Sequence, residues 1–308
     1  MIEHLNIINT KIIGLILFKV ETPIHIGAGD IGVRRSFLRV GDSFVIPSST
    51  WKGCFRSISE NIAKTMKFNY IELLSIKFYD EKTGDIKYSP LKEGCEDFIN
   101  LRDKLINIYR GFKSELPGVD KYTIKGLIHE LGFLEEEEKL NKIDENTWNR
   151  FVEVFLAINC PLGKLYGNRY MAAKIRFLDT LVKGRTSERT IIGINRRSLT
   201  VEEDYLSFIE TLNERYIKLT FIADNLKPGE GDSKLFTSTL NYIRKLGLNL
   251  GGSKSRGLGY LTIDEEKTRF YIIDLMQGNI DDKMYKIVNP FKYTTPTNIE
   301  GIFKWLKS

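Results

Sequence analysis

The chain has 308 residues, of which 42% are hydrophobic and 11% aromatic, enough for one large domain or two small ones with a packed core. No apolar run reaches roughly 18 residues and the three cysteines form no CxxC pair, which argues against a membrane span, a disulfide framework and a cysteine-rich zinc site. The net charge is +6, and the basic residues gather in 34–56, 164–197 and 244–256, a distribution typical of a polyanion-binding surface but also compatible with solvated faces.

The N-terminal part of the chain predicts a strand, a glycine-rich loop, a hairpin and a helix. Residues 12–20 predict an apolar strand that continues through TPIHIG into the loop GAGDIG. Residues 36–47 predict two extended stretches joined by a turn at Gly41 and Asp42. A helix is expected after Pro47, because three N-cap residue types follow it and apolar residues then recur at helical spacing.

The rest of the chain predicts an insertion followed by strands and one more helix. Residues 66–150 predict a mostly helical insertion. The expected elements after it are strands in 171–182 and 215–226, an amphipathic helix that begins at residue 232 and is stopped by Gly251 and Gly252, and a closing strand in 259–264.

This order of elements predicts an α+β fold with a ferredoxin-like or RRM-like core. We expect residues 1–65 and 151–264 to form the core, residues 66–150 to be inserted into it, and residues 265–308 to form a C-terminal extension.

The stretch LGGSKSRGLGYLTI, residues 250–263, predicts a glycine-rich loop that opens a strand. It is not a Walker A loop, because its lysine is displaced by one residue and the loop follows a helix and precedes a strand. RGLGYLTI is close to the RNP1 pattern but has Leu258 where an aromatic residue would stack on a base. Backbone N–H groups together with Lys254 and Arg256 would suit a sugar-phosphate chain, and the alternative is a plain turn.

The predicted helix after Pro47 offers a second position for an anion. Free N–H groups at a helix start favour phosphate, and Lys52 and Arg56 follow within the first turns, on a different face from the apolar stripe. The alternative is an ordinary capped helix with solvated cations.

Four blocks occur in order along the chain: TPIHIGAG, IPSSTWKGCFRS, CPLGKLYGNRYMAAKIRF and LGGSKSRGLGY. Together they resemble the signature blocks of the RAMP superfamily, the RNA-binding subunits of CRISPR effector complexes, especially the type III backbone subunits. The family's P-G-S-S-x-K-G block corresponds to residues 47–53, its C-P-x-C-x-x-F-G block to 160–167, and its G-G-x-x-S-R-G-x-G loop to 251–259. The resemblance covers residues 12–65 and 157–264.

The resemblance implies a CRISPR RNA-binding backbone or capping subunit of a type III CRISPR-Cas interference complex, a ribonucleoprotein of antiviral defence. Residues 186–203 would correspond to the family's β-hairpin thumb, which wedges into the guide–target duplex. The alternative is a peripheral hairpin that packs on a neighbouring subunit. The expected RNA-binding residues are Arg34, Arg35, Lys52, Arg56, Arg196, Arg197, Gly251, Gly252, Lys254, Ser255, Arg256 and Gly257.

The partners expected from the resemblance are CRISPR RNA, target RNA and other effector subunits, including neighbouring RAMP subunits. No membrane partner is expected, and the protein should be soluble and cytoplasmic.

Catalysis by this chain is not expected, although two alternatives stay open. Catalytic backbone subunits carry an Asp where this chain has Arg35, and the only acid in the loop is Asp30, which would have to support metal-dependent cleavage of target RNA. His25 would be the acid/base if the chain processed precursor CRISPR RNA. No cofactor is expected unless the chain is a nuclease that uses a divalent metal, and Gly163 in place of the second block cysteine argues against zinc. A purely architectural subunit is the remaining alternative.

Overall fold

The computed structural model describes residues 8–29, 33–65, 76–80, 85–89, 160–195, 197–198, 200–276 and 278–307. The chain divides into two compact units. The main unit consists of residues 6–63 and 174–308, and the second unit of residues 1–5 and 64–173.

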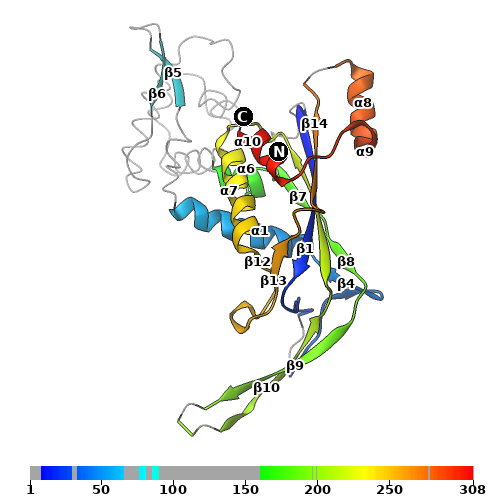
Figure 1. Ribbon diagram of the computed structural model, residues 1–308. Coiled ribbons are helices and arrows are strands. Elements are labelled where there is room, and N and C mark those ends of the chain that lie inside the picture. The colour runs from blue at the N-terminus through cyan, green and yellow to red at the C-terminus, as the bar shows by residue number, and fades with distance from the viewer. Residues whose placement is uncertain are drawn as a thin grey trace. The chain divides into compact units, whose positions relative to one another are not determined.

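The main unit is built on an antiparallel sheet with the strand order β12-β13-β1-β11-β7 (Figure 1). Its strands are β1 (Thr10–Val20), β7 (Ile175–Phe177), β11 (Tyr216–Asp224), β12 (Leu248–Asn249) and β13 (Tyr260–Ile263). The helix α1 (Ser48–Thr65) follows β1, and α7 (Gly231–Leu246) follows β11. Leaving out the two-residue β12, this is a β-α-β-β-α-β order with the first strand in the middle of the sheet, so the predicted α+β, ferredoxin-like class is confirmed.

The core lies between this sheet and its two helices. Alternate β1 side chains point to the helices, and of these Ile16 and Phe18 have no exposed surface. Phe18 stacks on Trp51 of α1 at 5.4 Å between ring centroids, as the apolar stripe of the predicted helix requires. Burial of each such side chain stabilises the fold by about 1.5–3 kcal/mol. Gly14 completes the packing, because a Cβ there would lie 2.1 Å from the ring of Phe221.

The helix α7 ends earlier than the sequence predicts. It stops at Leu246 and not at Gly251 and Gly252, because Gly247 leaves the helix with φ +70° while its N–H still bonds to the Ile243 carbonyl. A side chain at Gly247 would meet the Leu261 carbonyl oxygen at 2.5 Å, so only glycine lets the chain turn here into β12.

The predicted C-terminal extension takes part in the main sheet. Its strand β14 (Arg269–Asp274) pairs with the first half of β1, on the edge where β13 pairs with the second half. The helix α10 (Ile299–Lys307) packs against α7 and β14, while α8 (Ile280–Val288) and α9 (Pro290–Tyr293) lie over the other side of β14 (Figure 1).

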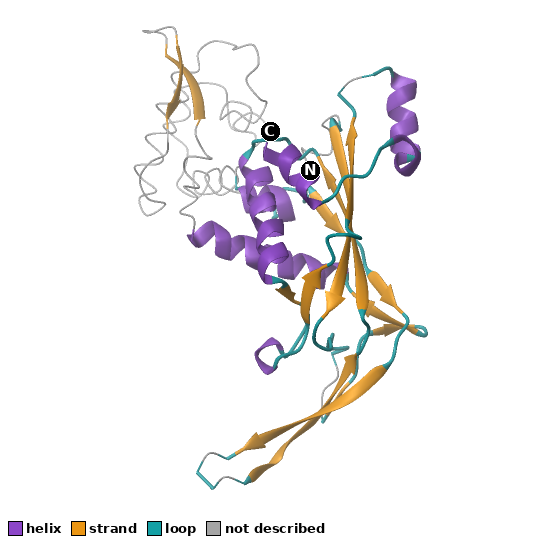
Figure 2. Cartoon of the chain, viewed as in Figure 1, coloured by secondary structure: helices purple, strands orange, loops and turns teal. Residues whose placement is uncertain are grey.

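A long hairpin extends from the sheet, formed by β9 (Thr186–Ile194) and β10 (Val201–Leu212) (Figure 2). We call it the thumb hairpin, and it confirms the hairpin predicted for this segment. The strand β2 (Arg34–Arg35) pairs in parallel with β10. The third sheet contains β3 (Arg39–Val40), β4 (Ser43–Ile46) and β8 (Thr180–Val182), with the predicted turn between β3 and β4.

The described residues of the second unit form a β-hairpin and a short helix: β5 (Ile76–Asp80), β6 (Asp85–Ser89) and α6 (Pro161–Tyr166). The helices predicted within 66–150 lie outside the described residues, so the extent of the insertion stays a prediction. None of the described helices is long and apolar enough to cross a membrane.

Candidate nucleic-acid interface

The glycine loop, residues 250–259, is held at its base by three backbone hydrogen bonds. The N–H of Leu250 donates to the Gly259 carbonyl at 2.8 Å and closes the loop on itself. The N–H groups of Gly252 and Gly259 donate to the carbonyls of His25 and Pro23, at 2.9 and 2.8 Å. The loop is therefore fixed to the segment that follows β1.

Two of the loop glycines are required by this close approach. Gly251 has φ +85°, and a Cβ there would lie 2.2 Å from the His25 carbonyl oxygen. Gly259 has φ +78°, and a Cβ would lie 2.0 Å from the Leu250 carbonyl oxygen. Any side chain at either position would push the loop away from its support.

The tip of the loop is exposed and cationic. It is a single 3-10 turn, η2 (Lys254–Arg256), flanked by the left-handed residues Ser253 and Gly257. Within the described residues, the N–H groups of Lys254 and Ser255 are not paired with another backbone group, and neither Lys254 nor Arg256 has a carboxylate partner. Unpaired N–H groups beside two cations can donate hydrogen bonds to phosphate oxygens.

The loop contacts α1 through Cys54, a residue that sequence reasoning missed. The Cys54 thiol donates to the Asn249 carbonyl at 3.2 Å, and the Lys254 Nζ lies 3.8 Å from its sulfur. Burial raises the pKa of the Cys54 thiol, and the Lys254 ammonium offsets this only in part. A protonated, buried thiol is a packing contact, so Cys54 sets the distance between loop and helix.

Lys52 and Arg56 lie on the other flank of α1. Side chains two residues apart on a helix point about 200° apart, so both are turned away from Cys54 and the loop. Arg56 pairs with Glu60 at 2.9 Å, and Lys52 has no ion pair among the described residues. Gly53, which is exposed, lies on the outer surface between the two flanks. The predicted cations therefore border the outer surface of α1 from two sides and do not form one cluster.

The start of α1 has fewer free N–H groups than the sequence predicted. Asp179, between β7 and β8, accepts a hydrogen bond from the Ser48 N–H at 2.6 Å. Hydrogen bonds from the Ser48 backbone and side chain lower the pKa of Asp179. The N–H groups of Thr50 and Trp51 donate to the Pro47 carbonyl. Because a carboxylate of the chain already caps this end, the cations and the glycine loop are the better anion contacts.

Arg34 and Arg35 lie beside the thumb hairpin, on the strand that pairs with β10. Arg34 forms an exposed ion pair with Glu188, and Arg35 is exposed. Arg189 of β9 was missed by sequence reasoning, yet it pairs with Ile209, the residue that also pairs with Arg35 across β10.

Towards its tip the hairpin exposes apolar side chains. Ile192, Ile194 and Leu206 are 47%, 56% and 41% exposed. Arg197 at the tip is exposed, and its N–H donates to the Asn195 side chain. Arg196 lies outside the described residues.

His25, which alternation predicts to point away from the face that Ile24 and Ile26 bury, is buried as well. It is 5% exposed, and its Nδ1 donates to the Glu210 carbonyl at 2.8 Å. Alternation does not indicate burial here, because all three side chains of the segment, Ile24, His25 and Ile26, are covered. Burial and this bond favour a structural role for His25. Asp30, the other catalytic candidate, lies outside the described residues.

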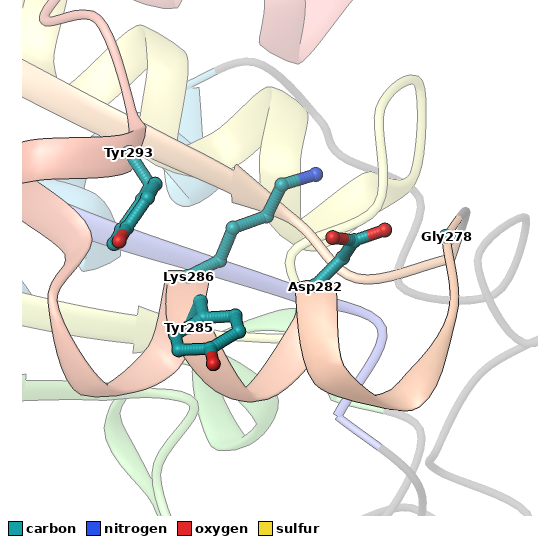
Figure 3. Close-up of a pocket in the computed structure, with 5 residues that line it drawn as sticks. All are labelled: Gly278, Asp282, Tyr285, Lys286 and Tyr293. Atoms are coloured by element: carbon teal, nitrogen blue, oxygen red, sulfur yellow. The ribbon is translucent and has the colours of Figure 1, made fainter.

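No group of three His, Cys, Asp or Glu residues that could hold a metal ion occurs in the described part of the chain. A pocket of about 260 Å³ lies at α8 and α9, and none of the predicted RNA-binding residues lines it (Figure 3). Its lining residues are Gly278, Asp282, Tyr285, Lys286 and Tyr293.

Comparison with known families gives one match. The family model described as "RAMPs: RAMP superfamily" matches residues 17–262, which begin within β1, end within β13 and leave out β14, α8, α9 and α10. No curated protein matches the chain.

Proposed function

The chain belongs to the RAMP superfamily, and from this premise we propose that it is a CRISPR RNA-binding backbone or capping subunit of a type III effector complex. RAMP proteins are associated with CRISPR-Cas complexes, where they bind CRISPR RNA and partner Cas subunits. The observation that carries the proposal is the exposed tip of the glycine loop, with Lys254, Ser255 and Arg256 next to α1.

The guide RNA would cross the outer surface of α1 between its two cationic flanks. Lys254 and Arg256 would contact phosphates from the loop side, and Lys52 and Arg56 from the other side. These contacts go to the sugar-phosphate backbone and give affinity without sequence preference, as a subunit that accepts any guide requires. Open space around Gly53 supports this path, because a Cβ built there would meet no atom of the described residues within 4 Å.

The thumb hairpin would reach the guide–target duplex. Its exposed Ile192, Ile194 and Leu206 could enter between base steps, while Arg34, Arg35 and Arg197 neutralise phosphates. The partners in this proposal are CRISPR RNA, target RNA and neighbouring effector subunits in the cytoplasm, in antiviral defence. We assign no catalytic residue and no cofactor to the chain.

The test is the affinity of the full-length protein for labelled single-stranded RNA, measured by fluorescence anisotropy over a range of salt concentrations. Lys254→Ala and Arg256→Ala should each weaken binding and make the slope of log K against log salt less steep by about 0.7, the value for one phosphate contact on a single strand. Lys304→Ala, an exposed lysine on α10, is the control and should change neither quantity. Unchanged affinity and slope in both loop variants would contradict the proposal.

A further inference from the structure

The segment 23–26 lies between the glycine loop and the base of the thumb hairpin. On one side, the Pro23 and His25 carbonyls accept the hydrogen bonds from the loop. On the other side, Ile24 exchanges two hydrogen bonds with Leu212 of β10, at 2.8 and 3.1 Å. The segment is thus bonded to both elements at once, although they are far apart in the sequence.

The His25 ring adds a third link between the same elements. Its Nδ1 must carry the proton, because the Glu210 carbonyl can only accept. The ring also lies beside the loop, since a Cβ built on Gly252 would be 3.4 Å from the His25 Cδ2. His25 is therefore bonded to β10 through its ring nitrogen and to the glycine loop through its carbonyl, with its ring beside Gly252.

Glu210, the residue that His25 contacts, is itself held firmly. Its carboxylate accepts the Phe37 N–H at 2.8 Å and pairs with Arg39. Partial burial raises the pKa of Glu210, but the bonds from Phe37, Thr186 and Arg39 outweigh it, so the pKa lies below the ordinary value. An ionised Glu210 keeps this part of β10 in place, and its backbone carbonyl therefore holds the His25 ring in one position.

We propose that His25 is a positioning residue that fixes the orientation of the thumb hairpin relative to the glycine loop. The two elements then meet one RNA strand at a constant spacing, and the second contact forms at high effective concentration once the first is made. That both elements bind RNA rests on the proposed function. That His25 fixes the orientation of the thumb hairpin, which we call the mechanical part of the inference, does not.

The mechanical part is tested by a distance measurement in the absence of RNA. Spin labels are placed at Thr190→Cys on β9 and Ser255→Cys in the loop, both exposed positions, in a chain with Cys95→Ser and Cys160→Ser. The remaining Cys54 is buried, and its raised thiol pKa makes it a poor labelling site. Pulsed electron–electron double resonance should give one narrow distribution of label-to-label distances for this reference protein.

Two substitutions separate the hydrogen bond from the bulk of the ring. His25→Phe keeps a ring but removes the donor to Glu210, and the distribution should broaden or shift. His25→Asn keeps a donor near the position of Nδ1, and the narrow distribution should return. A residue that only stabilised the core would lower Tm without changing the distances. If His25→Phe retains the narrow distribution, the proposal is overturned; should this variant not fold, His25→Ala with the same labels decides in the same way.

The functional part is tested with two RNA lengths. His25→Phe should weaken binding of an RNA long enough to reach both elements by ~10-fold, and leave unchanged the affinity for a short oligonucleotide that reaches only the loop. Equal losses for both lengths would overturn the positioning role. These measurements use the unlabelled protein without the Ser255→Cys change; if wild type binds neither RNA, the proposed function fails, while the distance distributions still decide the role of His25.

Discussion

Gly53 shows how a single residue can indicate a ligand. Glycine inside a helix costs about 1 kcal/mol relative to alanine, so its presence needs a reason. The described part of the fold supplies none: Gly53 does not have a positive φ, and a Cβ there would meet no atom of the described residues within 4 Å. By contrast, Gly251 and Gly259 are required by backbone contacts inside the chain. Close approach of RNA would supply a reason, because Gly53 lies where we propose that RNA crosses α1.

Gly53→Leu should therefore change stability and binding in opposite directions. Leucine is nearly as helix-favourable as alanine, so the free energy of unfolding should rise by up to about 1 kcal/mol in urea denaturation. The added bulk should lower RNA affinity by ~10-fold while the salt slope stays the same, because no charge is removed. Ser57→Leu, one turn further along the exposed surface, is the matched control. Gain of stability with unchanged affinity would show that RNA does not cross at Gly53.

At the scale of elements, the positions that carry local signals could be predicted from the sequence. The β1 strand, the start of α1 and the turn between β3 and β4 follow from an apolar run, N-cap types and turn residues within a few positions, and the thumb hairpin follows from the family resemblance. What could not be predicted depends on partners far along the chain. His25 is buried by β10, and the start of α1 is capped by Asp179.

Asp179 also allows a prediction for α1 as an element. Asp179→Ala should lower the free energy of unfolding at neutral pH by about 1 kcal/mol, as loss of a helix cap does. The folded-state pKa of Asp179 is lowered, so its contribution is present above the unfolded-state pKa and is lost as the pH falls through the folded-state value. The stability difference between wild type and variant should accordingly shrink in acid.

Urea denaturation at neutral and acidic pH measures this difference. Glu266→Ala, an exposed acidic residue outside α1, serves as the control for general charge effects. A difference that is the same at both pH values would argue against the capping role of the carboxylate.

At the scale of the whole molecule, the fold depends on its C-terminal residues more than the sequence suggests. The six-residue strand β14 covers the first half of one edge of β1, and Phe270, Ile302 and Leu306 are buried. The family match ends at residue 262, so these elements complete the sheet beyond the matched region. This role of β14 could not be predicted from the sequence, because an apolar segment does not indicate which distant strand it will pair with.

Removal of residues 265–308 should consequently prevent folding of the main unit. The truncated chain would expose half of one β1 edge and the apolar surface under α10, and exposed edges and apolar patches promote aggregation. We expect insoluble protein, or soluble protein without a cooperative thermal transition. A truncated chain that melts cooperatively near the wild-type Tm would show that the C-terminal elements are dispensable.

The central claim is that the glycine loop and α1 form one RNA-binding surface. Photo-crosslinking of the full-length protein to single-stranded RNA containing 4-thiouridine, followed by mass spectrometry of the crosslinked peptides, tests it most directly. We predict crosslinks in both 48–57 and 250–260, and their loss in a Lys254→Ala, Arg256→Ala double variant. Crosslinks confined to α8, α9 and α10, with none on the loop or on α1, would contradict the account.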